Sequence, residues 1–177
     1  MKCCTLLGHG FEELEAIGTL ALIKRSGIEA DLYGLSGETT SGKHDIPICG
    51  LLSLNDLNPD DYDLLLLPGG PHYVLIEQNE TARQLIRTFF EQNKPVAAIC
   101  ARPTILGRMG YLKGRKYTCF TSMNEDFGGT YLDQYVVTDG SLITGRSAAA
   151  AIDFGFAINE LLQGTAQKQR IQKEIYY

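Results

Sequence analysis

Four consecutive leucines followed by Pro-Gly-Gly, at residues 64–70, constrain the fold of this chain more than any other segment. An apolar run that stops on turn residues predicts a strand buried on both faces, because a half-buried strand would alternate apolar and polar side chains. Residues 95–100, with the sequence PVAAIC, have the same character. Such strands belong to parallel sheets that helices cover on both sides, so we expect an α/β protein.

Strand-like and helix-like segments alternate along the rest of the chain. Apolar residues at helical spacing predict helices at residues 12–27, 79–94, 101–110 and 148–164. The first of these is expected to bury Leu14, Ile17 and Leu20. Further strands are predicted at residues 3–8, 28–37 and 115–121, and hairpins at residues 37–50 and 135–145. This order predicts a doubly wound, mostly parallel, flavodoxin-like sheet with an added β-hairpin.

Length and composition indicate one globular domain over residues 1–177. The chain has 177 residues, of which 44% are hydrophobic and 21% are charged, as in an average globular protein. Residues 165–177 are predicted to form a helical tail that is frayed or packed on a partner. A net charge of -5 disfavours nucleic acid as a partner. Because no apolar stretch is long enough for a membrane span or a signal-peptide core, we expect no membrane association.

The five cysteines indicate a reducing environment. They include no CxxC pair and no spacing with histidine that suits zinc, so we expect free thiols, a cytoplasmic location and no bound metal. Ligands of open α/β sheets bind beyond the carboxyl ends of the strands. Four segments are predicted to meet at this rim, namely residues 9–15, 69–72, 100–102 and 120–121.

Cys100 has the position of a nucleophile on this rim. It ends a buried strand on a sharp turn into a helix, and the dipole of that helix favours a thiolate. Other α/β enzymes present a nucleophilic serine on a similar elbow. The alternative interpretation is a buried, inert cysteine.

Three motifs in register resemble the ThiJ/PfpI superfamily, and its DJ-one-like branch most of all. The motifs are Gly10-Phe11-Glu12-Glu13-Leu14-Glu15, Leu67-Pro68-Gly69-Gly70, and Ile99-Cys100-Ala101 followed by Pro103. Their order and spacing extend the resemblance over nearly the whole chain. The resemblance implies the α/β fold described above, a homodimer and activity without a cofactor.

The same resemblance implies roles for residues of the rim. Cys100 corresponds to the nucleophile and oxidation-sensitive thiol, and Glu15 to a protonated acid that hydrogen-bonds the sulfur. The backbone N–H groups of Gly70 and Ala101 would hold an oxyanion. A glutamate that keeps its proton beside a thiolate has a raised pKa and leaves the cysteine ionised.

Two positions depart from the family pattern. Phe120 occupies the place of the usual histidine near the cysteine, and Ala101 occupies that of the histidine found in the protease-like branch. The base is therefore expected to be His9, His72 or Glu15 itself.

Two arginines are further candidates. Arg102 replaces the small residue that is usual after Cys-Ala, and its guanidinium would hold an anionic substrate or an oxidised sulfur, or lie on the surface. Arg146 matches an arginine common in the family near the site and is expected to serve the structure or a dimer contact.

These observations favour an enzyme that acts on reactive carbonyls, of the glyoxalase III or protein deglycase type. Its substrate would be a small aldehyde such as methylglyoxal, or a glycated protein, attacked by the Cys100 thiolate. The alternative is a redox-responsive or chaperone-like protein in which Cys100 is oxidised to a sulfinic acid. Two functions rank last: amidase-like hydrolysis needs a Cys-His pair, and thiazole monophosphate biosynthesis would need a phosphate cradle that the sequence does not offer.

Overall fold

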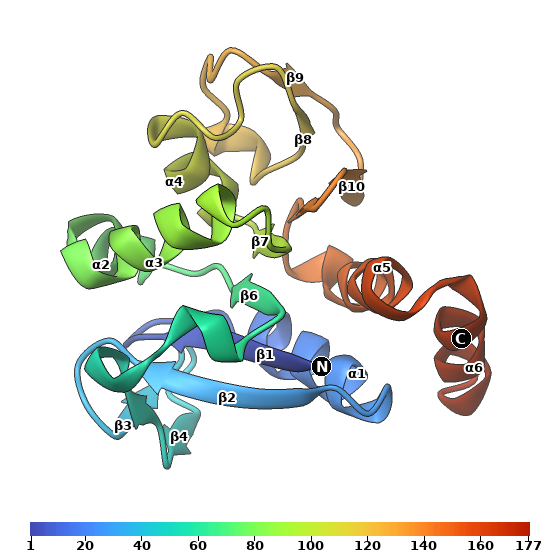
Figure 1. The fold of residues 1–177 in the computed structure, drawn as a ribbon, viewed down its shortest axis with the longest axis horizontal. Helices are drawn as coiled ribbons and strands as arrows, with labels where there is room; N and C mark the ends of the chain where they lie inside the picture. Colours follow the sequence, from blue (N-terminus) through green and yellow to red (C-terminus); the bar gives the residue numbers. More distant parts are fainter.

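A seven-stranded sheet forms the centre of the protein (Figure 1). In the computed structural model, which describes residues 1–177, the strand order is β10-β11-β7-β6-β1-β2-β5. All neighbours are parallel except β10 and β11, which form a hairpin. The strands are β1 (Lys2–Leu7), β2 (Glu29–Gly34), β5 (Leu52–Ser53), β6 (Leu64–Leu67), β7 (Val96–Ile99), β10 (Val136–Asp139) and β11 (Leu142–Gly145). The predicted α/β class is confirmed.

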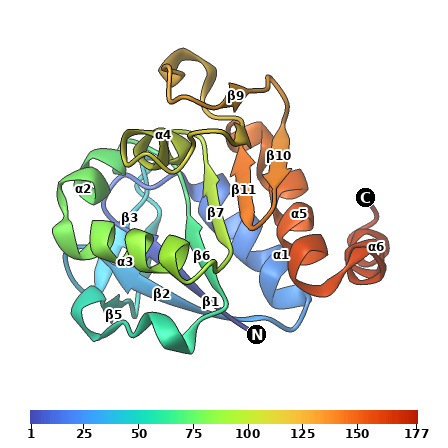
Figure 2. The same cartoon turned by 45° about the horizontal axis from the view of Figure 1, so that its top comes forward.

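Helices cover both faces of the sheet, and each face has its own core (Figure 2). Successive strand residues point to opposite faces, so on β6 Leu65 and Leu67 pack on one side and Leu64 and Leu66 on the other. All four leucines are fully buried. The first face carries α2 (Tyr73–Gln78), α3 (Glu80–Glu91) and α4 (Arg102–Arg108), and the second carries α1 (Thr19–Arg25) and α5 (Ala151–Gln163). No helix is both long enough and apolar enough to cross a bilayer.

The first predicted helix is interrupted by a π-helical turn. Residues Leu14–Gly18 form this turn, η1, and α1 continues from it. A π turn has one more residue than an α turn, so it rotates the side chains relative to an uninterrupted helix. Leu20 is buried as predicted, but Leu14 and Ile17 are 52% and 42% exposed, so the prediction that they face the core is wrong.

The segment at residues 115–121 also differs from prediction. Only Lys116–Tyr117 is a strand, β8, and it pairs with β9 (Thr130–Tyr131) in a small separate sheet. β8 does not pair with the central sheet, and beyond it the N–H of Thr118 donates to the side-chain hydroxyl of Thr144 on β11 at 2.9 Å. The predicted hairpin at residues 37–50 is present as β3 (Thr39–Ser41) and β4 (Pro47–Cys49).

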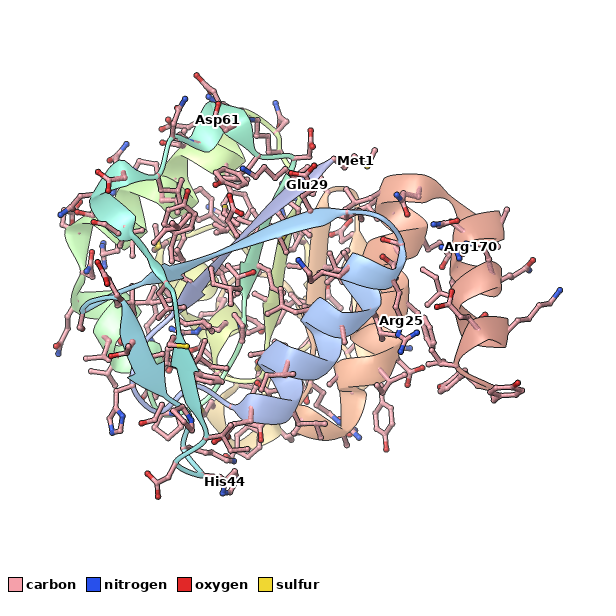
Figure 3. All side chains as sticks on the ribbon, turned by 90° about the horizontal axis from the view of Figure 1, so that it is seen from below. Met1, Arg25, Glu29, His44, Asp61 and Arg170 are labelled. Carbon is pink, nitrogen blue, oxygen red and sulfur yellow. The ribbon has the colours of Figure 1, made fainter.

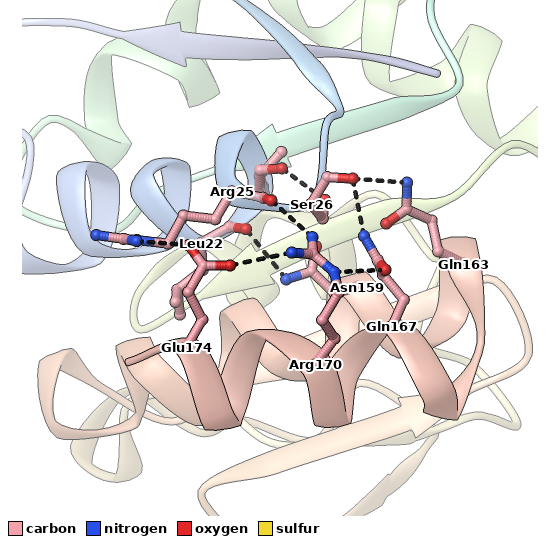
Figure 4. Close-up of polar contacts among 9 residues, drawn as sticks. Leu22, Arg25, Ser26, Asn159, Gln163, Gln167, Arg170 and Glu174 are labelled. Atoms are coloured by element: carbon pink, nitrogen blue, oxygen red, sulfur yellow. Dashed lines mark hydrogen bonds and ion pairs between the residues drawn. The ribbon is translucent and has the colours of Figure 1, made fainter. Parts of the chain in front are cut away.

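The C-terminal tail packs on its own chain as α6 (Thr165–Glu174), as Figures 3 and 4 show. Gly164, with φ of 86°, ends α5 and redirects the chain. Ile171 is fully buried, and Gln167 donates to the Ser26 carbonyl at 3.0 Å. Arg170 donates to the Arg25 carbonyl at 3.0 Å. These contacts hold α6 against the end of α1.

We expect Ile171→Ala to lower the free energy of unfolding by about 2–4 kcal/mol, because it removes a buried side chain and leaves a cavity. Lys173→Ala, at an exposed position of the same helix, should change it by less than about 0.5 kcal/mol. Urea denaturation measures both. Equal, small effects would mean that the tail is frayed in solution.

Candidate active site

Cys100 lies on a strained turn between β7 and α4. Its φ is +64°, a left-handed conformation that a residue with a side chain rarely adopts. The N–H of Cys100 donates to the Gly145 carbonyl at 2.9 Å, and its own carbonyl accepts from the N–H of Phe120 at 2.8 Å. The turn therefore presents the sulfur at the carboxyl end of the sheet, in the geometry of a nucleophile elbow.

Glu15 reaches Cys100 from the π-helical turn η1. Its side chain is fully buried, and Oε2 accepts from the N–H of Gly69 at 2.8 Å. The Glu15 carboxyl group lies beside Cys100, close enough that each group shifts the pKa of the other. The N–H of Glu15 donates to Glu12 Oε2 at 2.8 Å, which fixes the turn at its start. Gly69 thus fixes the carboxyl group of Glu15 and Glu12 fixes its backbone, so that the carboxyl group is held beside the Cys100 elbow.

Two glycines make this close approach possible. A Cβ at Gly69 would lie 2.4 Å from Glu15 Oε2 and 2.5 Å from Cys100 Cβ. Gly70 has φ of +109°, and a Cβ there would lie 2.5 Å from the Gly10 carbonyl oxygen. Gly69 is therefore required by the close approach of Glu15 and Cys100, and Gly70 by its left-handed backbone and the close approach of Gly10.

A cavity of about 420 Å³ opens above the sulfur. Tyr73, Phe120 and Met123 form an apolar wall, and Glu12 and Lys43 form a charged edge, with Lys43 Nζ 3.8 Å from Glu12 Oε1. The remaining lining residues are Glu15, Gly70, Pro71, Cys100, Ala101, Ser147 and Ala148. The cavity has room for a small carbonyl compound and part of a larger molecule that carries it.

Burial shifts the acidity of both groups of the pair. Burial, followed by the charge of Glu12, raises the pKa of Glu15 to about 7. Burial, followed by the charge and hydrogen bond of Glu15, raises the pKa of Cys100 to about 12, although backbone hydrogen bonds from Ala101 and Gly70 oppose this shift. The raised Glu15 pKa agrees with expectation. Burial thus disfavours ionisation of both groups, and the charge of Glu15 further disfavours ionisation of Cys100.

Neither histidine of the predicted rim lines this cavity. His72 is 1% exposed and contacts the ring of Phe11 edge-on, so the expectation that it reaches the mouth of the site is wrong. Burial and the nearby Arg102 lower the pKa of His72 to about 2, which makes it a poor base near neutral pH. His9 is exposed, and its Nδ1 pairs with Ser41 Oγ at 3.0 Å in a separate hollow.

Three further predicted site residues are Arg102, Phe120 and Arg146, and of these Phe120 alone lines the cavity. Arg102 is fully buried, not on the surface, and its Nε donates to the Pro68 carbonyl at 2.7 Å. Phe120 is 42% exposed and lines the cavity. Arg146 lies outside it, paired with Asp133 at 2.9 Å and stacked over the ring of Tyr135.

Sequence reasoning missed Lys43, which the β3–β4 hairpin brings to the cavity from far along the chain. No spacing or pattern identifies it. Nearby, carboxylate oxygens of Glu12 and Glu13 lie within 4.8 Å of a ring nitrogen of His44, a spacing that would suit a metal ion. However, Glu13 Oε1 already accepts from the N–H of His44 at 2.7 Å, and Lys43 faces Glu12. The carboxylates of this possible metal site are thus already engaged by protein groups, Glu13 by the His44 N–H and Glu12 by Lys43.

The chain is similar to known proteins over most of its length. The model of the DJ-1/PfpI family matches residues 1–161. The chain is similar to Deglycase TK1284 of Thermococcus kodakarensis (37% identity) and Deglycase PfpI of Pyrococcus furiosus (35% identity), each over 82% of this chain and 90% of the relative. The crystal structure of Drosophila melanogaster DJ-1beta superposes with a TM-score of 0.91 at 31% identity, covering 99% of this chain and 97% of that chain.

The raised pKa of Glu15 predicts a pH dependence of stability. Because its folded pKa of about 7 exceeds the ordinary 4.5, the folded state binds more protons than the unfolded state between these pH values. Stability should therefore fall as pH rises from 4.5 to 7, by up to about 3 kcal/mol. Glu15→Gln should abolish this part of the slope in urea unfolding, whereas Glu91→Gln, at an exposed carboxylate, should retain it. Equal slopes in wild type and Glu15→Gln would contradict the assignment.

Proposed function

The chain belongs to the DJ-1/PfpI family, and we propose that it is a cofactor-independent cysteine enzyme that acts on reactive carbonyls, as a protein deglycase or glyoxalase. The observation that carries this proposal is the contact between Glu15 and the Cys100 thiol on a strained elbow. The names of the two archaeal relatives, both deglycases, support the substrate class.

The first step is addition of sulfur to the aldehyde carbon of methylglyoxal. As the carbon–sulfur bond forms, the Glu15 carboxylate takes the thiol proton, and the carbonyl electron pair moves to oxygen. The N–H groups of Gly70 and Ala101 face the sulfur and can donate to the developing oxyanion. Return of the proton to that oxygen gives a hemithioacetal. A carboxyl group with a pKa of about 7 can give and take a proton near neutral pH, so no histidine is required.

The second step is an internal redox transfer. Glu15 removes the proton from the carbon bound to sulfur and returns it to the neighbouring ketone carbon, while the hydroxyl proton moves to the ketone oxygen, so that the first carbon is oxidised and the second reduced. The product is a thioester of lactate, which water hydrolyses to lactate and the free thiol. On an early glycation adduct, a hemiaminal, the sulfur bonds to the same carbon as its bond to nitrogen breaks, and the amine leaves with the proton that Glu15 took from the thiol, giving the same hemithioacetal.

A redox-responsive or chaperone-like role is the second candidate. Cys100 is partly exposed to the cavity, where peroxide can reach it, and oxidation to a sulfinic acid requires no base. All five cysteines are unpaired, which suits the reducing cytoplasm that we propose as the location.

We expect wild-type protein to form lactate from methylglyoxal, and Cys100→Ser and Glu15→Gln to lower kcat/KM by at least about 100-fold, because each loses a group that acts in the first step. Cys49→Ser, at an exposed cysteine outside the cavity, is the matched control and should retain activity. If wild type forms no lactate and releases no amine from glycated peptide, yet Cys100 is oxidised by peroxide, the redox role replaces the enzymatic one.

We propose a homodimer formed through the exposed face of η1 and α1. Leu14 and Ile17 protrude there, beside an apolar groove of about 340 Å³ that is lined by Leu20, Leu32 and Ile48 among others. A two-fold axis would place the protruding side chains of one copy against the groove of the other. Pairing of this kind covers apolar surface that is exposed in the single chain.

Ile17→Glu should convert this dimer to monomer in light scattering, because it places a charge on the apolar face. Val74→Glu is the matched control: Val74 is similarly exposed but lies on α2, on the opposite face of the sheet, and its substitution should leave the dimer intact. A monomeric wild type, or equal effects of the two changes, would contradict this interface.

A further inference from the structure

We propose that Arg102 is a positioning residue whose buried positive charge balances the one negative charge shared by Cys100 and Glu15. Arg102 does not line the cavity, so it does not touch substrate. The inference rests on the proposed role of Cys100 as the reactive thiol, but it is independent of which carbonyl compound is the substrate.

The surroundings of Arg102 provide little compensation for its charge. The side chain is fully buried, and only Nε has a hydrogen-bond partner, the Pro68 carbonyl. Both terminal guanidinium nitrogens lack one, and the side chain forms no salt bridge. A buried charge is costly unless an opposite charge lies nearby. The anionic groups that act on this guanidinium are Glu15 and Cys100.

The neighbouring basic side chain, His72, does not share this charge. Both of its ring nitrogens are buried without a hydrogen-bond partner. Burial and the charge of Arg102 keep it neutral. Arg102 is therefore the buried basic side chain that carries a positive charge here near neutral pH, although burial lowers its pKa to about 9.

Arg102 also connects the Cys100 elbow to the loop at Pro68 and Gly69. It begins α4, two residues after Cys100, and its Nε bonds the carbonyl of Pro68. The next residue, Gly69, donates its N–H to Glu15. One side chain thus fixes the loop that is hydrogen-bonded to Glu15 relative to the elbow that carries Cys100.

Two other charged side chains, Glu12 and Lys43, lie near Glu15 and Cys100. Glu12, at the start of η1, adds a negative charge that raises the pKa of Glu15. Lys43, from the β3–β4 hairpin, is partly exposed and faces Glu12, so solvent screens much of its effect. The N–H groups of Gly70 and Ala101 contribute dipoles only. Lys43 favours ionisation of Glu15 from this partly exposed position, whereas Arg102 supplies the fully buried positive charge near the pair.

Two substitutions separate the charge of Arg102 from its hydrogen bond. Arg102→Gln keeps a donor for the Pro68 carbonyl and loses the charge, whereas Arg102→Lys keeps the charge. The readout is the rate at which iodoacetamide alkylates Cys100 between pH 5 and pH 10, followed by peptide mass spectrometry. Arg146→Gln, which removes an arginine outside the cavity, is the control.

We expect Arg102→Gln to slow alkylation of Cys100 at pH 7 by about tenfold and to move the pH midpoint upward by about one pH unit. Arg102→Lys and Arg146→Gln should stay within about threefold of wild type. A midpoint that is unchanged in Arg102→Gln, or shifted equally in Arg102→Lys, would overturn the inference. If Arg102→Gln does not fold, a wild-type midpoint in Arg102→Lys supports the inference and a shifted one overturns it.

The experiment also separates this inference from the proposed function. If wild-type Cys100 reacts no faster than the exposed Cys49 at any pH, both the reactive thiol and the role of Arg102 are wrong. If Cys100 is reactive but indifferent to the charge at Arg102, only the inference fails.

Discussion

The site depends on one contact, between the buried carboxyl group of Glu15 and the sulfur of Cys100. A left-handed backbone at Cys100 turns the sulfur toward the rim, and the π-helical turn η1 turns Glu15 toward the sulfur. Gly69 lies between them, with no room for a side chain. Each of these conformations is unfavourable alone, and the surrounding sheet and helices make them tolerable.

Charge balance explains why these groups can be buried together. Two acids at such close range do not both ionise readily in a low-dielectric environment, so above about pH 7 the pair holds one proton and one negative charge. Arg102 is the buried cation of opposite sign, and His72 remains neutral beside it. The proposed proton transfer does not depend on a histidine at position 120, because burial raises the pKa of Glu15 to about 7.

The turn η1 contributes both to the active site and to the exposed apolar face of the protein. Its inner side inserts Glu15 beside the sulfur, and the same rotation of the backbone leaves Leu14 and Ile17 exposed on the outer side. The element that completes the site is therefore the one on which the proposed dimer would form. Association of two chains there would restrict η1 and, through it, the position of Glu15.

The sequence alone determined the α/β class, the hairpins and the nucleophile elbow at Cys100, because doubly buried strands, turn glycines and the family motifs are local signals. It did not reveal that residues 115–121 leave the sheet, that His72 is buried or that Lys43 joins the cavity. Nor did it show that Arg102 is an internal charge. Those outcomes depend on contacts between segments that are far apart in the sequence. A local sequence pattern does not identify such tertiary contacts.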